Sequence, residues 1–81
     1  MKHKLPPQPA TLEMKIIEYR VLEVGVPSST AADWVKRQAS TFGTINYLPN
    51  RKLIRLNINE EYLAIEVRRY LQELWHEEMA G

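Results

Sequence analysis

The side chains that could support catalysis are few and lie far apart in the sequence. The chain has two histidines, His3 and His76, and no cysteine. A Ser-His-Asp or Cys-His set needs an imidazole held beside the nucleophile. We expect no such set, because His3 lies in a proline-rich tail and His76 near the C-terminus. The glycines Gly25, Gly43 and Gly81 are too scattered to form a phosphate-binding loop. The sequence therefore predicts no enzyme activity and no small-molecule cofactor.

One pair of residues has the spacing of metal ligands. Glu73 and His76 form an E-x-x-H motif, which di-iron helical bundles use. Those sites need two such pairs and further carboxylates, whereas this chain has one pair, so we predict no metal site. Glu60 and Glu61 do not converge as an acid and a base, because neighbouring side chains of a helix point about 100° apart. We interpret them as charges at the start of a helix.

Basic residues near an aromatic ring indicate a possible nucleic-acid surface. The candidate residues come from a predicted hairpin and from the outer face of the first predicted helix. They are the cations Lys36, Arg37, Arg51, Lys52 and Arg55 and the aromatic Tyr47, with Lys2 and Lys4 in the tail. Cations of this kind contact phosphates. Against this, the pI is about 8.1 rather than above 9, and residues 60–81 hold six acidic residues against two basic ones. Nucleic-acid binding is therefore our alternative hypothesis.

The last predicted helix, over residues 60–79, has more apolar residues than one sheet can cover. A sector of about 100° is wide enough to face a sheet, and it holds Leu63, Val67, Tyr70, Leu71 and Leu74. A second line holds Ile65, Trp75 and Met79 and runs through Arg68 and Gln72. We expect the second line to be partly exposed unless another chain or the tail covers it. Two interpretations stay open. Either Ile65, Arg68, Trp75 and Met79 form an interface, or Trp75 and Met79 fold over the sheet edge.

The elements that position these residues follow the order β-α-β-β-α. Residues 12–26 are rich in β-branched residues and favour one long strand with a bulge, because a helix would expose two apolar faces. Ser28, Ser29 and Thr30 can cap the start of a helix, and Gly43 can terminate it as the C′ residue. Residues 44–48 and 52–59 alternate as a hairpin, and Asn59 can cap the last helix.

This order predicts an α+β fold, a three-stranded antiparallel sheet with two helices on one face. It matches the first five elements of a ferredoxin-like unit whose closing strand is absent. In that order the third strand lies in the middle, and the first strand keeps a free edge. Residues 1–10, with Pro6, Pro7 and Pro9, are predicted to be a flexible basic tail, and residues 11–81 a single domain.

Composition limits the class of protein. A chain of 81 residues has room for one hydrophobic core. The lack of cysteine indicates a reducing compartment, which we take to be the cytoplasm, and no apolar stretch is long enough for a membrane helix. Our leading hypothesis is a small protein-interaction or assembly module. We expect a homodimer joined through the first-strand edge, through the second line of the last helix, or through both.

Overall fold

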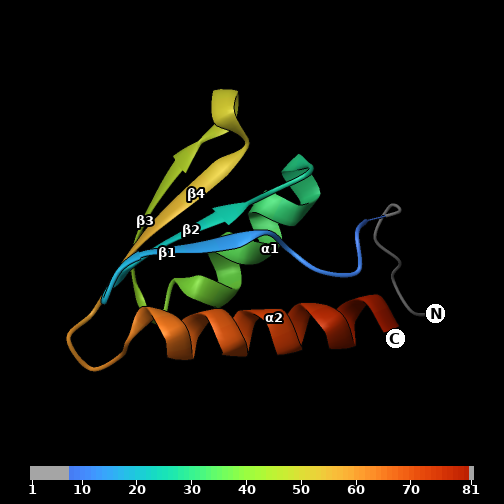
Figure 1. Cartoon of the computed structure of the whole chain (residues 1–81). Helices are drawn as coiled ribbons and strands as arrows, with labels where there is room; N and C mark the ends of the chain where they lie inside the picture. Colours follow the sequence, from blue (N-terminus) through green and yellow to red (C-terminus); the bar gives the residue numbers. More distant parts are fainter. Residues whose placement is uncertain (1–7, 81) are drawn as a thin grey trace.

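The computed structural model describes residues 8–80 and contains an antiparallel sheet and two α-helices (Figure 1). The order is β1 (Met14–Glu18), β2 (Val21–Gly25), α1 (Ser29–Ala39), β3 (Gly43–Leu48), a 3-10 turn (Pro49–Arg51), β4 (Leu53–Ile58) and α2 (Ala64–Ala80). Across the sheet the strand order is β1-β2-β4-β3, and all neighbours are antiparallel. The predicted α+β class is confirmed, but the prediction of three strands is wrong, because the sheet has four.

The additional strand arises because the predicted long strand over 12–26 is a hairpin. β1 and β2 pair with Ile16 opposite Leu22, and the chain reverses at Tyr19 and Arg20. Neither turn residue has a positive φ, so the turn does not need the Gly or Asn that marks the commonest two-residue hairpins. The pairing register shifts between Ile16 and Glu18, at the place where the sequence predicts a bulge. The chain does not continue as one strand, however, because it reverses at Tyr19 and Arg20.

Helix α1 begins where the sequence predicts. The Ser28 hydroxyl accepts a hydrogen bond from the Ala31 backbone N–H at 3.1 Å and caps the helix. The predicted end at Gly43 is wrong, because the helix ends at Ala39 and Gly43 is the first residue of β3. A Cβ on Gly43 would overlap the carbonyl oxygen of Asn57. Glycine is therefore needed at this position for the close approach of β3 to β4.

The hairpin of β3 and β4 is confirmed, and it projects beyond the other strands in Figure 1. Tyr47 lies opposite Ile54, and Asn46 lies opposite Arg55. The turn ends at Lys52, which has a left-handed conformation with φ of 51°. β4 lies between β2 and β3, so the predicted central position of the strand over 52–59 is also confirmed.

Helix α2 begins at Ala64 rather than at residue 60. Glu66 Oε1 accepts the backbone N–H of Leu63 at 2.9 Å, and the carbonyl of Tyr19 accepts the N–H of Ala64 at 2.6 Å. These bonds satisfy two of the backbone donors at the start of the helix. The predicted cap Asn59 does not cap α2, because a separate turn lies between Asn59 and the helix. The Glu66 carboxylate and the Tyr19 carbonyl of the β1–β2 turn cap it instead.

Both helices cover the same face of the sheet. On β4 the side chains of Ile54, Leu56 and Ile58 are buried, while Asn57 between them is exposed. Trp34 of α1 and Trp75 of α2 meet edge to face with ring centroids 5.0 Å apart. The buried residues of α2 are Ala64, Val67, Leu71 and Trp75. This stripe confirms part of the predicted core sector but is rotated toward Trp75, and Leu63 and Tyr70 are exposed instead.

Candidate protein-interaction surfaces

The second apolar line of α2 is largely covered by the segment before β1. The Gln72 amide makes two hydrogen bonds with the backbone of Leu12, because Oε1 accepts from its N–H and Nε2 donates to its C=O, both at 2.8 Å. The Trp75 indole N–H donates to the carbonyl of Pro9 at 3.0 Å. Trp75 is 0% exposed and Met79 is partly buried against the core. Trp75 and Met79 therefore fold into the domain, and Pro9 of the predicted tail bonds to the Trp75 indole.

Of the four residues predicted as an interface, Ile65 and Arg68 stay at the surface. The predicted tail over residues 1–10 falls partly outside the described residues, which begin at Gln8. Two of the described tail residues bond to the domain. The Pro9 carbonyl accepts from the Trp75 indole N–H, and Gln8 Oε1 accepts from the Ser28 hydroxyl at 3.2 Å. Two hydrogen bonds therefore tie residues 8 and 9 to the domain.

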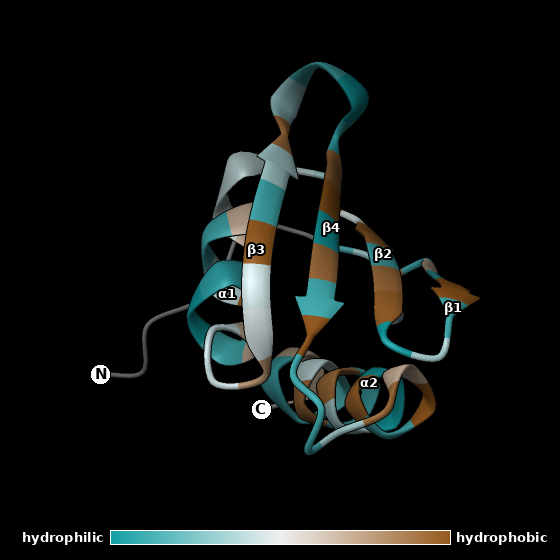
Figure 2. Ribbon diagram, turned by 90° about the vertical axis from the view of Figure 1, so that its left-hand side faces the viewer, coloured by the Kyte–Doolittle hydropathy of each residue, from teal (hydrophilic) through white to brown (hydrophobic). Residues whose placement is uncertain are grey.

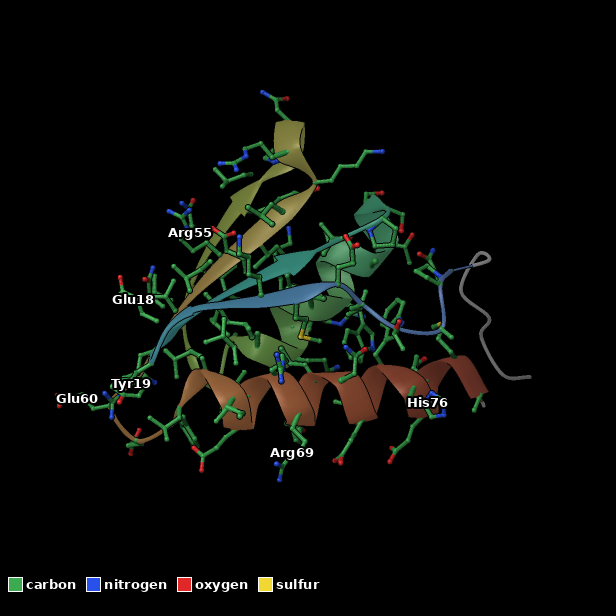
Figure 3. The ribbon with its side chains drawn as sticks, viewed as in Figure 1. Glu18, Tyr19, Arg55, Glu60, Arg69 and His76 are labelled. Atoms are coloured by element: carbon green, nitrogen blue, oxygen red, sulfur yellow. The ribbon has the colours of Figure 1, made fainter. Side chains whose placement is uncertain are left out.

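A separate group of apolar side chains lies at the opposite end of α2. The large hydrophobic side chains exposed in residues 8–80 are Ile17, Tyr19, Leu63, Ile65 and Tyr70. Ile17 and Tyr19 come from β1 and the turn after it, and Leu63, Ile65 and Tyr70 come from the residue before α2 and its first two turns. The Tyr70 ring packs edge to face on Phe42, so it lies on another side of α2 than Ile65. We call these five residues the apolar end. Tyr19 is 83% exposed, and Figure 3 shows it beside Glu60, where the β1–β2 turn meets the start of α2.

The free edge of β1 carries several features that prevent pairing with another strand. The Gly25 N–H donates to the Glu13 carbonyl, so by alternation the backbone groups of Leu12, Met14 and Ile16 point away from β2. The groups of Leu12 are bonded by Gln72. A register irregularity follows Ile16 and a lysine, Lys15, lies in the strand. A bulge, a charged side chain and a side-chain cap are common means of protecting an edge strand.

The free edge of β3 has none of these features. Its sequence, GTINYL, is uncharged and its pairing with β4 is regular. The Asn59 N–H donates to the Phe42 carbonyl, so by alternation Gly43, Ile45 and Tyr47 point their N–H and C=O groups away from β4. Within residues 8–80 no hydrogen bond reaches these outward groups. Figure 2 shows β3 as the outermost strand on its side, with α1 beside it and partly behind it.

The six residues predicted for nucleic-acid binding lie on different surfaces. The Lys36 ammonium lies 4.8 Å from the centre of the Tyr47 ring, on the side of the sheet that the helices cover, and also 3.4 Å from Asp33. Arg55 lies on the other side of the sheet, because it alternates with buried residues of β4. Arg37 lies on α1, and Arg51 and Lys52 lie at the hairpin tip. The structure thus does not bring these six residues to one face, and nucleic-acid binding stays a prediction.

The side of the sheet away from the helices is crossed by a polar row. Lys15, Glu23, Arg55 and Asn46 lie side by side on the four strands. Arg55 Nε and Nη2 donate to Glu23 Oε2 at 3.0 and 2.6 Å. This ion pair joins the two central strands. The Arg55 guanidinium thus already has an anionic partner within the chain.

Two negative findings concern residues 8–80. The structure there has no group of three His, Asp or Glu side chains close enough together to hold a metal ion. Glu73 and His76 are both exposed on α2, and Figure 3 shows His76 in the last part of the helix. None of the helices in these residues is both long and apolar enough to cross a membrane.

Comparison of the chain with protein-family models, with curated proteins and with solved structures found no match. Its function is therefore inferred from the arrangement of its own residues.

Sequence reasoning missed the edge of β3, although a signal was present. Residues 43–48 hold no charge and no proline, which distinguishes them from the charged strand over 14–18. The prediction places the free edge on the first strand, because the sequence pattern does not show that residues 12–26 reverse to form a hairpin. The apolar end was missed for the same reason, since the β1–β2 turn brings Ile17 and Tyr19 to the start of α2.

Proposed function

We propose that the chain is a non-catalytic protein-interaction module that works as a homodimer. The observation that supports this proposal is the contrast between the two sheet edges. β1 is protected by a bulge, by Lys15 and by the Gln72 cap, whereas β3 presents unprotected backbone groups on a regular, uncharged strand. An unprotected edge is a template for a strand from another chain.

The apolar end supports the same class of function. Exposed apolar groups that gather in one place mark protein contacts more often than single exposed ones do. Tyr19 carries its ring at the tip of a turn and is 83% exposed, and Ile65 is 50% exposed. Their side chains add little to the core, so we assign the apolar end to contact with a protein that the homodimer binds.

We also propose that the fold is a ferredoxin-like variant. The elements β2-α1-β3-β4-α2 follow the predicted order, and β1 lies beside β2, where the closing strand of that fold would lie. This arrangement is relevant to the interaction because it leaves β3, rather than β2, as the strand with an unprotected edge.

The oligomeric state tests the proposed function. We expect sedimentation equilibrium to give twice the 9.5 kDa mass of one chain at concentrations above the dissociation constant, which we place at about 1–100 µM. A strict monomer up to about 1 mM would contradict the proposal.

A further inference from the structure

We propose that two copies of the chain join along β3, in the antiparallel register that places Ile45 of each copy opposite Ile45 of the other. This inference rests on the proposed homodimer and adds which strand forms the joint and how the two strands align. The joint would continue the four-stranded sheet of each copy into a single sheet across the dimer.

The register follows from the outward backbone groups of β3. In an antiparallel pair, two residues that face each other through their hydrogen-bonding groups exchange two bonds. With Ile45 opposite Ile45, Gly43 of each copy lies opposite Tyr47 of the other, so all three outward residues are paired. A shift of two residues in either direction leaves one of the three outside the strand. In one direction that residue would face Pro49, which has no N–H.

The side chains are compatible with this register. Ile45 and Tyr47 point toward the helices and are partly buried, so the two Ile45 side chains would extend the core across the joint. The Tyr47 ring would lie beside Gly43 of the second copy, and an aromatic ring opposite a glycine is a favourable cross-strand pair. On the open side of the sheet, the exposed Thr44 would lie directly opposite the exposed Asn46.

Helix α1 enlarges the contact beyond the two strands. It contacts β3 more than any other strand, and it lies on the helix-covered side of the sheet. Pairing of β3 with β3 would therefore place the two α1 helices next to each other under the joint. Two short strands alone bury less than the roughly 1,000 Å² of a stable interface, so the α1 contact is needed to reach the micromolar range.

A set of charge variants at residues 44 and 46 tests both the strand and the register. Both side chains are exposed in the single chain, so the substitutions should leave the fold intact, which circular dichroism and urea unfolding check. In the proposed register residue 44 of one copy faces residue 46 of the other. Like charges at directly opposed positions repel, and opposite charges attract.

We expect Thr44→Lys/Asn46→Lys and Thr44→Glu/Asn46→Glu each to weaken the dimer by about tenfold or more. Thr44→Lys/Asn46→Glu is the matched control, and its dimer should be as tight as that of the unaltered chain. A mixture of the double-lysine and double-glutamate chains should form a heterodimer, because each contact then joins opposite charges. Sedimentation and native mass spectrometry measure all four cases.

The outcomes separate this inference from the proposed function. If the unaltered chain is a monomer, both fail. If the unaltered chain is a dimer and the double-lysine chain is an equally tight dimer, the homodimer stands and the β3 joint is refuted. If the two like-charge variants dissociate and Thr44→Lys/Asn46→Glu dissociates as well, the strand is right and the register is wrong, because another register sets like charges of that variant against each other.

Amide hydrogen exchange gives a readout without any substitution. The N–H groups of Gly43, Ile45 and Tyr47 should exchange more slowly as the protein concentration rises through the dissociation constant. The N–H groups of Met14 and Ile16, at the β1 edge, are the internal control and should not change. Protection that rises at β1 and not at β3 would overturn the proposed joint.

Discussion

Replacement of Trp75 tests whether this side chain belongs to the core or to an interface. Trp75 is 0% exposed, its ring meets Trp34 edge to face with centroids 5.0 Å apart, and its indole N–H donates to the Pro9 carbonyl. A Trp→Ala change in a core costs about 3–5 kcal/mol. An 81-residue domain has a total stability of about 4–12 kcal/mol, so Trp75→Ala should leave the fold marginal. The milder Trp75→Phe keeps an aromatic ring and loses the hydrogen bond, at about 1–2 kcal/mol.

The assay is urea unfolding followed by circular dichroism, at two protein concentrations, so that any contribution of dimer formation is seen as a change of the midpoint with concentration. With a slope of about 1–2 kcal/mol per M urea, Trp75→Phe should lower the midpoint by about 1 M. Ile65→Ala, on the same helix and 50% exposed, is the matched control and should cost about 0.5 kcal/mol or less. A dimer that dissociates in Trp75→Phe without loss of stability would refute the assignment of Trp75 to the core.

Two further substitutions test the cap of the β1 edge and the role of one glycine. Gln72→Ala removes both hydrogen bonds to Leu12 and should lower the free energy of unfolding by about 1–2 kcal/mol, with faster amide exchange at Leu12; unchanged exchange there would show that the cap does not hold the edge. Gly43→Ala forces a methyl group against the Asn57 carbonyl and should cost about 1–3 kcal/mol in urea unfolding. Gly25→Ala is its control, because the nearest atom to the added Cβ lies at an ordinary 3.5 Å, and equal losses in the two variants would contradict the steric reasoning.

The parts of the fold that could be predicted from the sequence depend on local signals. The β3–β4 hairpin follows from the alternation of apolar residues on both sides of Pro49 and Asn50. The start of α1 follows from Ser28, whose hydroxyl accepts a nearby N–H. Both signals lie within a few residues of the structure that they specify.

The parts that could not be predicted depend on contacts between distant residues. Trp75 is buried because its indole reaches Pro9, 66 residues earlier, and Gln72 reaches Leu12 across 60 residues. Helical spacing does place Trp75 on one stripe with Ala64, Val67 and Leu71, but the predicted core sector includes Leu63 and Tyr70 and is therefore rotated away from it. No local pattern shows that a preceding segment covers the Trp75 indole. The same holds for α2, whose first N–H groups are satisfied in part by the carbonyl of Tyr19.

The unprotected edge is that of β3 because residues 12–26 form a hairpin, which the sequence pattern does not reveal. Had residues 12–26 been one strand, its outer side would have been the free edge of the sheet. Because the chain reverses at Tyr19 and Arg20, β1 covers β2 and is itself protected by Lys15, by a bulge and by Gln72. A sheet of this kind has two edges, and protection of one of them leaves the other to meet a partner. A chain with two unprotected edges could join β1 of one copy to β3 of the next and so form open assemblies rather than a closed dimer. The residues that protect β1 therefore support β3 as the joint as strongly as the composition of β3 does.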